Sequence, residues 1–173
     1  MIQLFFLLQI FFLETKTTDN KVNEFLKANS SFIEISQIKK DQHWAAMGRL
    51  RFTADKTTEV GLNYTENKNV DIQLYSFQYT NEQKAKSAFG NLMACFPKKC
   101  VEIKWNESKN GEFLPAIYII DENEIFSLKV NCANNDSNWE DLKKLAKSFF
   151  GTESSIIAET NCDKLTWTVN RSK

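Results

Sequence analysis

Cys95 and Cys100 lie five positions apart on either side of Pro97, and such a pair could form a disulfide bond, hold a metal or act as a redox couple. A thioredoxin-like redox site needs two residues between its cysteines, whereas this pair has four. Zinc sites draw on clustered Cys and His, but the other two cysteines, Cys132 and Cys162, are thirty positions apart. The spacing therefore favours a disulfide over a metal or redox site.

The other reactive residue types give no recognisable active site. His43 is the single histidine of the chain, and a Gly-x-Ser-x-Gly nucleophile elbow is absent from the sequence. The sequence also contains no Gly-rich phosphate loop and no dinucleotide fingerprint. We therefore predict no catalytic residue, no cofactor and no metal ligand.

Carboxylates are numerous enough for a glycosidase-like pair, in which one acid protonates the leaving group and the other attacks or activates water. The candidates are Glu102, Asp121, Glu122, Glu124 and Glu140. Solvated turns account for such residues in most soluble domains. A small secreted hydrolase that uses paired carboxylates is therefore kept as an alternative function.

Aromatic side chains supply a second kind of candidate site. Some alternate along one expected strand and the others fall on strands that could neighbour it, so together they could line an apolar pocket or an exposed binding face. Core packing under a helix is the alternative role. The candidate ligand-facing residues are Tyr75, Phe77, Tyr79, Trp105, Tyr118 and Trp167.

Composition and charge limit the partners. Lys plus Arg and Asp plus Glu balance at 22 each, so no overall field attracts nucleic acid or an anionic membrane. The 173 residues, 42% of them hydrophobic, suffice for one domain with a dense core. We therefore expect one globular domain that does not bind nucleic acid.

The chain begins with thirteen largely apolar residues, MIQLFFLLQIFFL, and then becomes polar. This run is too short for a membrane-spanning helix, which needs about twenty residues, but has the length of a signal-peptide core. The run has no basic residue before it and no clear small-x-small cleavage site after it, which argues against a signal peptide. The alternatives are a buried core segment and a membrane-associated tail. We expect a signal peptide or apolar leader over 1–17, a single domain over 18–173 and no integral membrane span.

Export would place the domain outside the cytoplasm, in the periplasm or secreted, where an even number of cysteines usually pairs. The chain reversal at Pro97 can bring Cys95 and Cys100 within the roughly 4.4–6.8 Å between Cα atoms that a disulfide requires. Cys132 would then pair with Cys162. The sequence thus predicts two disulfide bonds.

Three segments have the apolar periodicity of helices, at 18–28, at 81–95 and from 137 to Gly151. Capping-box patterns that start at Thr80 and Ser137 mark the beginnings of the second and third helices, and Gly151 is placed as a C-terminal cap.

Strands are expected at 32–35, 49–53, 59–64, 70–79, 101–105, 113–120, 125–131, 156–158 and 165–169. Segment 38–48 is ambiguous between loop and strand, and 70–79 has the pattern of a central strand. Segment 101–131 is predicted to form a three-stranded meander, and the last two segments alternate like one or two edge strands. The order predicts an α+β fold, a mostly antiparallel sheet with two or three helices packed on one face.

These features favour an exported, disulfide-stabilised, non-enzymatic domain that binds a partner protein or a small apolar ligand through its sheet face or its strand edges. The carboxylate hydrolase and a structural envelope protein are the alternatives. A cleft with two convergent carboxylates would favour the hydrolase.

Overall fold

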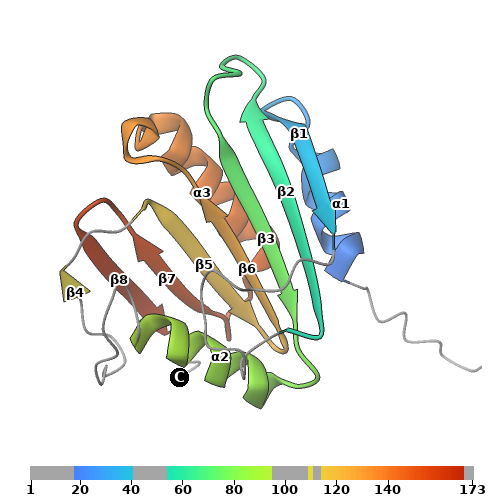
Figure 1. The fold of residues 1–173 in the computed structure, drawn as a ribbon, viewed down its shortest axis with the longest axis vertical. Helices are drawn as coiled ribbons and strands as arrows, with labels where there is room; N and C mark the ends of the chain where they lie inside the picture. Colours follow the sequence, from blue (N-terminus) through green and yellow to red (C-terminus); the bar gives the residue numbers. More distant parts are fainter. Residues whose placement is uncertain (1–17, 41–53, 95–108, 111–113, 170–173) are drawn as a thin grey trace, which may run out of the picture.

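A computed structural model describes residues 18–40, 54–94, 109–110 and 114–169. In these ranges three α-helices, a short 3-10 helix and eight strands follow one another (Figure 1). They are α1 (Thr18–Ala28), β1 (Ile33–Lys40), β2 (Lys56–Tyr64), β3 (Ile72–Gln78), α2 (Glu82–Ala94), β4 (Lys109–Asn110), β5 (Ala116–Asp121), β6 (Glu124–Lys129), η2 (Cys132–Asn134), α3 (Ser137–Phe150), β7 (Ile156–Thr160) and β8 (Lys164–Val169).

The strands form one antiparallel sheet in the order β1-β2-β3-β6-β5-β7-β8-β4. Figure 1 shows α1 and α3 behind this sheet and α2 in front of one end of it. The α+β class, the antiparallel sheet and the packing of two helices on one face confirm the prediction. The remaining helix, α2, packs on the opposite face, which we call the α2 face.

The middle strands send alternate side chains into two separate cores, because successive residues of a strand point to opposite faces. On β6, Phe126 enters the core beneath α1 and α3, which we call the helix-pair core, while Ile125 enters the core beneath α2. On β3, Leu74 and Phe77 divide in the same way. This two-sided burial explains why β3 is apolar on both faces, and β3 lies between β2 and β6 as a central strand.

Aromatic rings join α1, α3 and β6 in the helix-pair core. Phe150 of α3 stacks on Phe126 with 4.2 Å between ring centroids, and packs against Phe25 of α1 at 4.7 Å. Such pairs add about 0.5–1.5 kcal/mol each beyond the burial of their area. The two helices on this face are therefore fixed both to the sheet and to each other.

Two helix caps lie one residue away from the positions that the sequence patterns predict. Asp136, not Ser137, caps α3, and its carboxylate accepts a hydrogen bond from the backbone N–H three residues on at 3.1 Å. Asn81, not Thr80, does the same for α2 at 2.9 Å. Each pair of neighbours contains two good capping residues, so the path of the chain before the helix decides which one caps.

The end of α3 is as predicted, at Gly151. The backbone N–H of Gly151 donates to the carbonyl of Lys147 at 3.0 Å, and a Cβ at this position would lie 2.6 Å from the same oxygen. Glycine is therefore required by the close approach of two backbone segments.

Strand β1 is longer than predicted and includes the start of the ambiguous segment 38–48. Its pairing with β2 shifts register between Ile35 and Gln37, so Ser36 forms a bulge. Gly61 of β2 lies opposite this bulge, where a Cβ would come within 2.9 Å of the Ser36 hydroxyl. The bulge interrupts the two-residue alternation, which is why the sequence pattern of β1 stops near Ile35.

The order of the later strands corrects three predictions. Strand β5 has β6 on one side and β7 on the other, which corrects the first link of the expected meander 101–131. Strand β7 is interior rather than an edge, and β4 forms where a connecting loop was expected. Segments 49–53 and 101–105 themselves lie outside the described residues.

Cys132 in η2 and Cys162 in the turn between β7 and β8 form the predicted disulfide bond, with 5.8 Å between their Cα atoms. The bond links the segment after β6 to the turn after β7. These two strands are not neighbours in the sheet, because β5 lies between them. Cys95 and Cys100 lie outside the described residues, and their bond stays a prediction.

Replacing both Cys132 and Cys162 by serine should lower the free energy of unfolding by about 3–4 kcal/mol, because the bond closes a loop with a sequence separation of 30 residues. Denaturant unfolding of the variant and the wild type measures the difference. A variant that unfolds at the wild-type denaturant concentration would contradict this role.

Candidate functional site

Four of the six candidate aromatic residues lie on the α2 face. Phe77, Tyr79 and Tyr118 are at most 2% exposed and belong to the core beneath α2. Tyr75 packs against the same core but remains half-buried. The first three therefore serve the core, and Tyr75 is the one that solvent reaches.

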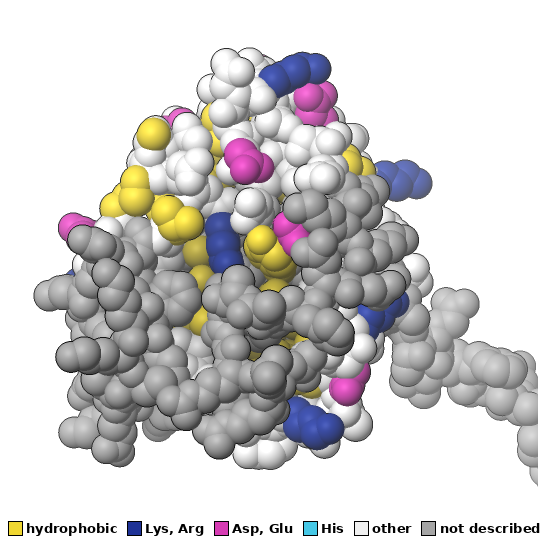
Figure 2. Space-filling view, in the orientation of Figure 1, with side chains coloured by type: hydrophobic (Ala, Val, Ile, Leu, Met, Phe, Trp, Pro, Cys, Tyr) yellow, Lys and Arg dark blue, Asp and Glu magenta, His cyan; other side chains and the backbone are white. Residues whose placement is uncertain are grey.

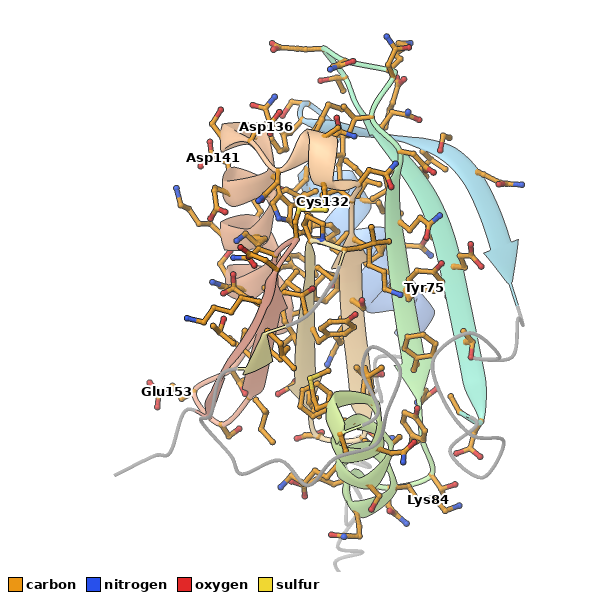
Figure 3. The ribbon with its side chains drawn as sticks, turned by 60° about the vertical axis from the view of Figure 1, so that its left-hand side comes forward. Tyr75, Lys84, Cys132, Asp136, Asp141 and Glu153 are labelled. Atoms are coloured by element: carbon orange, nitrogen blue, oxygen red, sulfur yellow. A yellow bond between two sulfur atoms is a disulfide. The ribbon has the colours of Figure 1, made fainter. Side chains whose placement is uncertain are left out.

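The α2 face combines apolar and basic groups at its surface. Figure 2 shows a basic side chain set among hydrophobic ones in the middle of this face. Figure 3 shows Tyr75 on β3, between α2 and the end of the sheet at which Cys132 lies. This part of the face, beyond the end that α2 covers, is the candidate site.

The register of the sheet aligns two rows of residues across this part of the α2 face, about 7 Å apart along each strand. The first row is Glu59, Tyr75, Ser127, Tyr118, Ala158 and Trp167. The second row is Gly61, Gln73, Lys129, Ala116, Thr160 and Leu165. Trp167 is placed only by its backbone, and Trp105 lies outside the described residues.

Lys129 and Tyr75 form the centre of the site. The Lys129 ammonium stands over the Tyr75 ring, 4.8 Å from its centroid, in a cation–π contact. The Tyr75 hydroxyl donates to Oε1 of Gln73 at 2.9 Å. The charge of Lys129 is thus held against an aromatic surface, and the ring is fixed in turn by a hydrogen bond.

Burial governs the electrostatics of this pair. It lowers the pKa of Lys129 to about 8, although the negative charge of Glu59 acts in the opposite direction. Burial, together with Glu59, raises the pKa of Tyr75 to about 12. Tyr75 is therefore neutral near pH 7. Lys129 is still mostly charged at pH 7, and burial of this charge costs folding free energy.

Ser127 lies beside Tyr75 in the first row, two positions before Lys129 on β6. It is 1% exposed, and its hydroxyl has no hydrogen-bond partner among the residues that the structure describes. An unsatisfied buried polar group costs about 1–3 kcal/mol. Among the described residues with such an atom, Ser127 is the one on the α2 face. We call Tyr75, Lys129, Ser127, Gln73 and Glu59 the Tyr75–Lys129 site.

Two of the candidate carboxylates, Asp121 and Glu124, face each other across the β5–β6 turn and are 8% and 4% exposed. Lys21 of α1 reaches them at 3.5 and 3.1 Å. The hydroxyls of Thr152 and Ser155 donate to Asp121 at 2.8 and 3.1 Å. The cluster ties α1 and the loop after α3 to the hairpin, which is a structural arrangement rather than an acid and a nucleophile.

Two of the remaining candidate carboxylates, Glu122 and Glu140, do not join this cluster. Glu122 is exposed in the turn, and Glu140 pairs with Lys143 on α3 at 2.8 Å. Glu102 and His43 lie outside the described residues. In the described ranges no group of three or more His, Cys, Asp or Glu could hold a metal ion, and no helix has the length and apolarity to cross a membrane.

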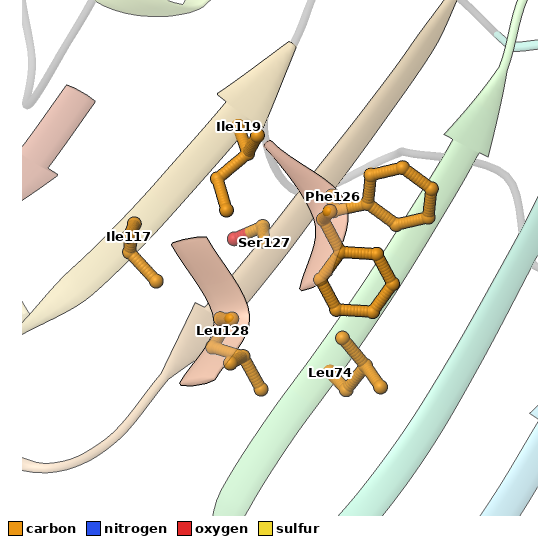
Figure 4. Close-up of a pocket in the computed structure, with 8 residues that line it drawn as sticks. Leu74, Ile117, Ile119, Phe126, Ser127 and Leu128 are labelled. Atoms are coloured by element: carbon orange, nitrogen blue, oxygen red, sulfur yellow. The ribbon is translucent and has the colours of Figure 1, made fainter. Parts of the chain in front are cut away.

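Two hollows lie away from the α2 face. Figure 4 shows the first, among side chains such as Leu74, Ile117 and Phe126 of the helix-pair core, and it has no room for a water molecule. It is a packing gap. The second is a groove of about 390 Å³ between α1 and β1, lined by residues that include Leu26 and Ile35.

Comparison of the chain with protein-family models, with curated proteins and with solved structures finds no match. The assignment of a site therefore depends on the geometry of the described residues alone.

Sequence reasoning missed Lys129, Ser127, Gln73 and Glu59. The sequence does contain a signal for two of them. Ser127 and Lys129 alternate with core residues along β6, so one face of this strand ends in polar side chains. Their burial could not be foreseen, since it depends on how much of the α2 face the helix covers.

Lys129→Met should stabilise the protein near pH 7, because it removes a largely buried charge and keeps a side chain of similar length. The folded-state pKa of about 8 lies below the ordinary 10.5, so the wild type bears this cost below pH 8 and loses it as the pH rises towards 10.5. We expect a gain on the order of 1–2 kcal/mol at pH 7 that shrinks by pH 10.

Denaturant unfolding at both pH values measures this gain. Lys84→Met, at an exposed position on α2, is the matched control and should change little. A gain that persists unchanged at pH 10 would show that charge burial is not its cause.

Proposed function

We propose that this protein is a non-enzymatic binding domain, exported to the periplasm or secreted, that takes up a small ligand with an apolar body and an anionic end. The Tyr75–Lys129 site on the α2 face is where the ligand binds. The observation that carries the proposal is the Lys129 ammonium, held 4.8 Å over the Tyr75 ring beside a buried hydroxyl without a partner.

An anionic group on the ligand would complement the positive charge of Lys129. Burial lowers the pKa of Lys129 more than the negative charge of Glu59 raises it, so a further negative charge beside the amine would favour its charged form. A carboxylate or sulfonate at the ammonium would add a charge-assisted hydrogen bond, worth about 1.5–3 kcal/mol. The Ser127 hydroxyl is available to the same anion or to a water molecule bound with it.

The apolar part of the ligand is matched by the surroundings of the lysine. The Tyr75 side chain beside the lysine is half-buried, so part of it remains open to solvent. An aromatic face that solvent reaches can pack against the hydrocarbon body of a ligand. The ligand class is therefore an amphipathic anion.

Export is supported by the apolar leader and by the Cys132–Cys162 disulfide. Disulfides persist mainly in oxidising compartments. In the native host we expect the protein outside the cytoplasm, shortened by about the length of a signal peptide and with no free thiol. Fractionation and intact mass under non-reducing conditions measure this; full-length protein with four thiols would contradict export.

Dodecanoate should bind more tightly than dodecanol or dodecyltrimethylammonium, because only the carboxylate is complementary to Lys129. Lys129→Met should weaken dodecanoate binding at least about tenfold, the equivalent of roughly 1.4 kcal/mol. Calorimetric titration measures both, with Lys84→Met as the control for general attraction to a positive surface.

The pH dependence gives a second readout of the same site. Affinity for dodecanoate should fall above pH 8 as Lys129 loses its proton, and should be flat in this range for Lys129→Met. Equal binding of the three probes, or equal affinity of wild type and Lys129→Met, would refute the site. No binding at all would favour a structural protein.

A further inference from the structure

The Cys132–Cys162 bond closes the end of the sheet at which the Tyr75–Lys129 site lies (Figure 3). Lys129 is the last residue of β6, and Cys132 follows three positions later. Thr160 is the last residue of β7, and Cys162 follows two positions later. Because Lys129 and Thr160 belong to the same row, with β5 between them, the bond joins the two segments that leave this row.

The bond keeps the chain segments after β6 and β7 close together. Neighbouring strands lie about 4.7–4.9 Å apart, so two strands with a third between them are separated by roughly 9.5 Å. The Cα atoms of Cys132 and Cys162 are 5.8 Å apart. The segments that carry them therefore converge beyond the start of β5.

Two hydrogen bonds hold the segment that enters β5 between these converging ends. On the β6 side, the backbone N–H of Val130 donates to the carbonyl of Pro115 at 3.0 Å. On the β7 side, the hydroxyl of Thr160 donates to the carbonyl of Leu114 at 2.6 Å. Val130 directly follows Lys129, so this hydrogen bond and the disulfide together fix the strand end that carries the amine.

The contact of Lys129 with Tyr75 depends on where that strand end lies. Ile125 and Phe126, at the other end of β6, are packed in the two cores of the sheet. The ammonium of Lys129 is held over a ring of the neighbouring strand β3, at the end of the α2 face that α2 does not cover. A displacement of the end of β6 would therefore take the ammonium off the ring and into water.

Solvent reaches the disulfide bond. Cys132 is exposed and Cys162 is half-buried. Exposed disulfides are reduced by thiols more readily than buried ones, and regulatory disulfides are drawn from this class. A dissolved thiol can therefore reach this bond in the folded protein.

We propose that the Cys132–Cys162 bond is a redox control of the Tyr75–Lys129 site. The oxidised bond holds the end of β6 so that the ammonium lies on the Tyr75 ring, and reduction releases this end and weakens ligand binding. The inference rests on the proposed function, because it concerns the affinity of the same site.

The reductant is a dithiol, which acts by thiol–disulfide exchange. Its thiolate attacks one sulfur of the bond, and its second thiol then displaces that sulfur from the mixed disulfide. Two electrons pass from the dithiol, which becomes a cyclic disulfide. Cys132 and Cys162 each end as a thiol.

The variant Cys132→Ser/Cys162→Ser tests this control without altering the other two cysteines. Dodecanoate should bind to it at least about fivefold more weakly than to the wild type. The titration midpoint of Lys129 should rise from near pH 8 towards 10.5, because a released strand end exposes the amine to water. Calorimetry and the NMR shift of the Lys129 ε-carbon measure the two effects, at a temperature at which circular dichroism shows both proteins folded.

Leu142→Ala is the matched control for a general loss of stability. Leu142 is buried in the helix-pair core, on the opposite face of the sheet, and its truncation destabilises the fold to an extent comparable with the loss of the disulfide. This variant should keep the wild-type affinity and midpoint. If it weakens binding as much as the loss of the bond does, the redox control is overturned.

The midpoint is measured without ligand, so the redox control and the proposed function can fail separately. A wild type that binds no dodecanoate refutes the proposed function, whatever the midpoint does. A wild type that binds, with a folded Cys132→Ser/Cys162→Ser variant unchanged in affinity and midpoint, overturns the redox control alone.

Discussion

The alternation of β6 between two hydrophobic cores is the constraint on which the rest of the structure depends. Phe126 and Leu128 must enter the helix-pair core, so Ile125, Ser127 and Lys129 are directed to the α2 face. Helix α2 buries the end of that face at Ile125 but not the end at Lys129. The amine is thereby left largely buried without a helix to cover it, and it lies against the nearest ring, that of Tyr75.

This arrangement costs free energy that an apolar residue would not. A buried ammonium with a lowered pKa and a hydroxyl without a partner both oppose folding. The stacked phenylalanines of the helix-pair core and the Cys132–Cys162 bond stabilise the same sheet and offset that cost. Polar groups that weaken a fold and share one face are typical of functional sites, and here they support the proposed binding of an anion.

Local sequence patterns predict the elements of this fold better than their arrangement. Helix α1 has the predicted bounds, and α2 and α3 begin within one residue of a capping pattern, since caps and apolar stripes are local. The face on which α2 packs and the place of β7 inside the sheet depend on contacts between distant segments. The bulge at Ser36 arises from a pairing with Gly61 that no local pattern contains.

The candidate site was predictable in part for the same reason. Alternation placed Tyr75, Phe77 and Tyr79 on one face, but their burial is set by how far α2 extends, which separates Tyr75 from the two core residues. Lys129 had the pattern of a solvated strand end. Only the packed structure brings its amine to the Tyr75 ring.

The pKa of the Lys129 side chain, followed by the chemical shift of its ε-carbon in an NMR titration, tests the central claim most directly. The structure predicts a midpoint near pH 8 that rises when dodecanoate is present, because an anion favours the charged amine. A midpoint at the ordinary 10.5, unchanged by dodecanoate, would contradict both the burial of the amine and the proposed site.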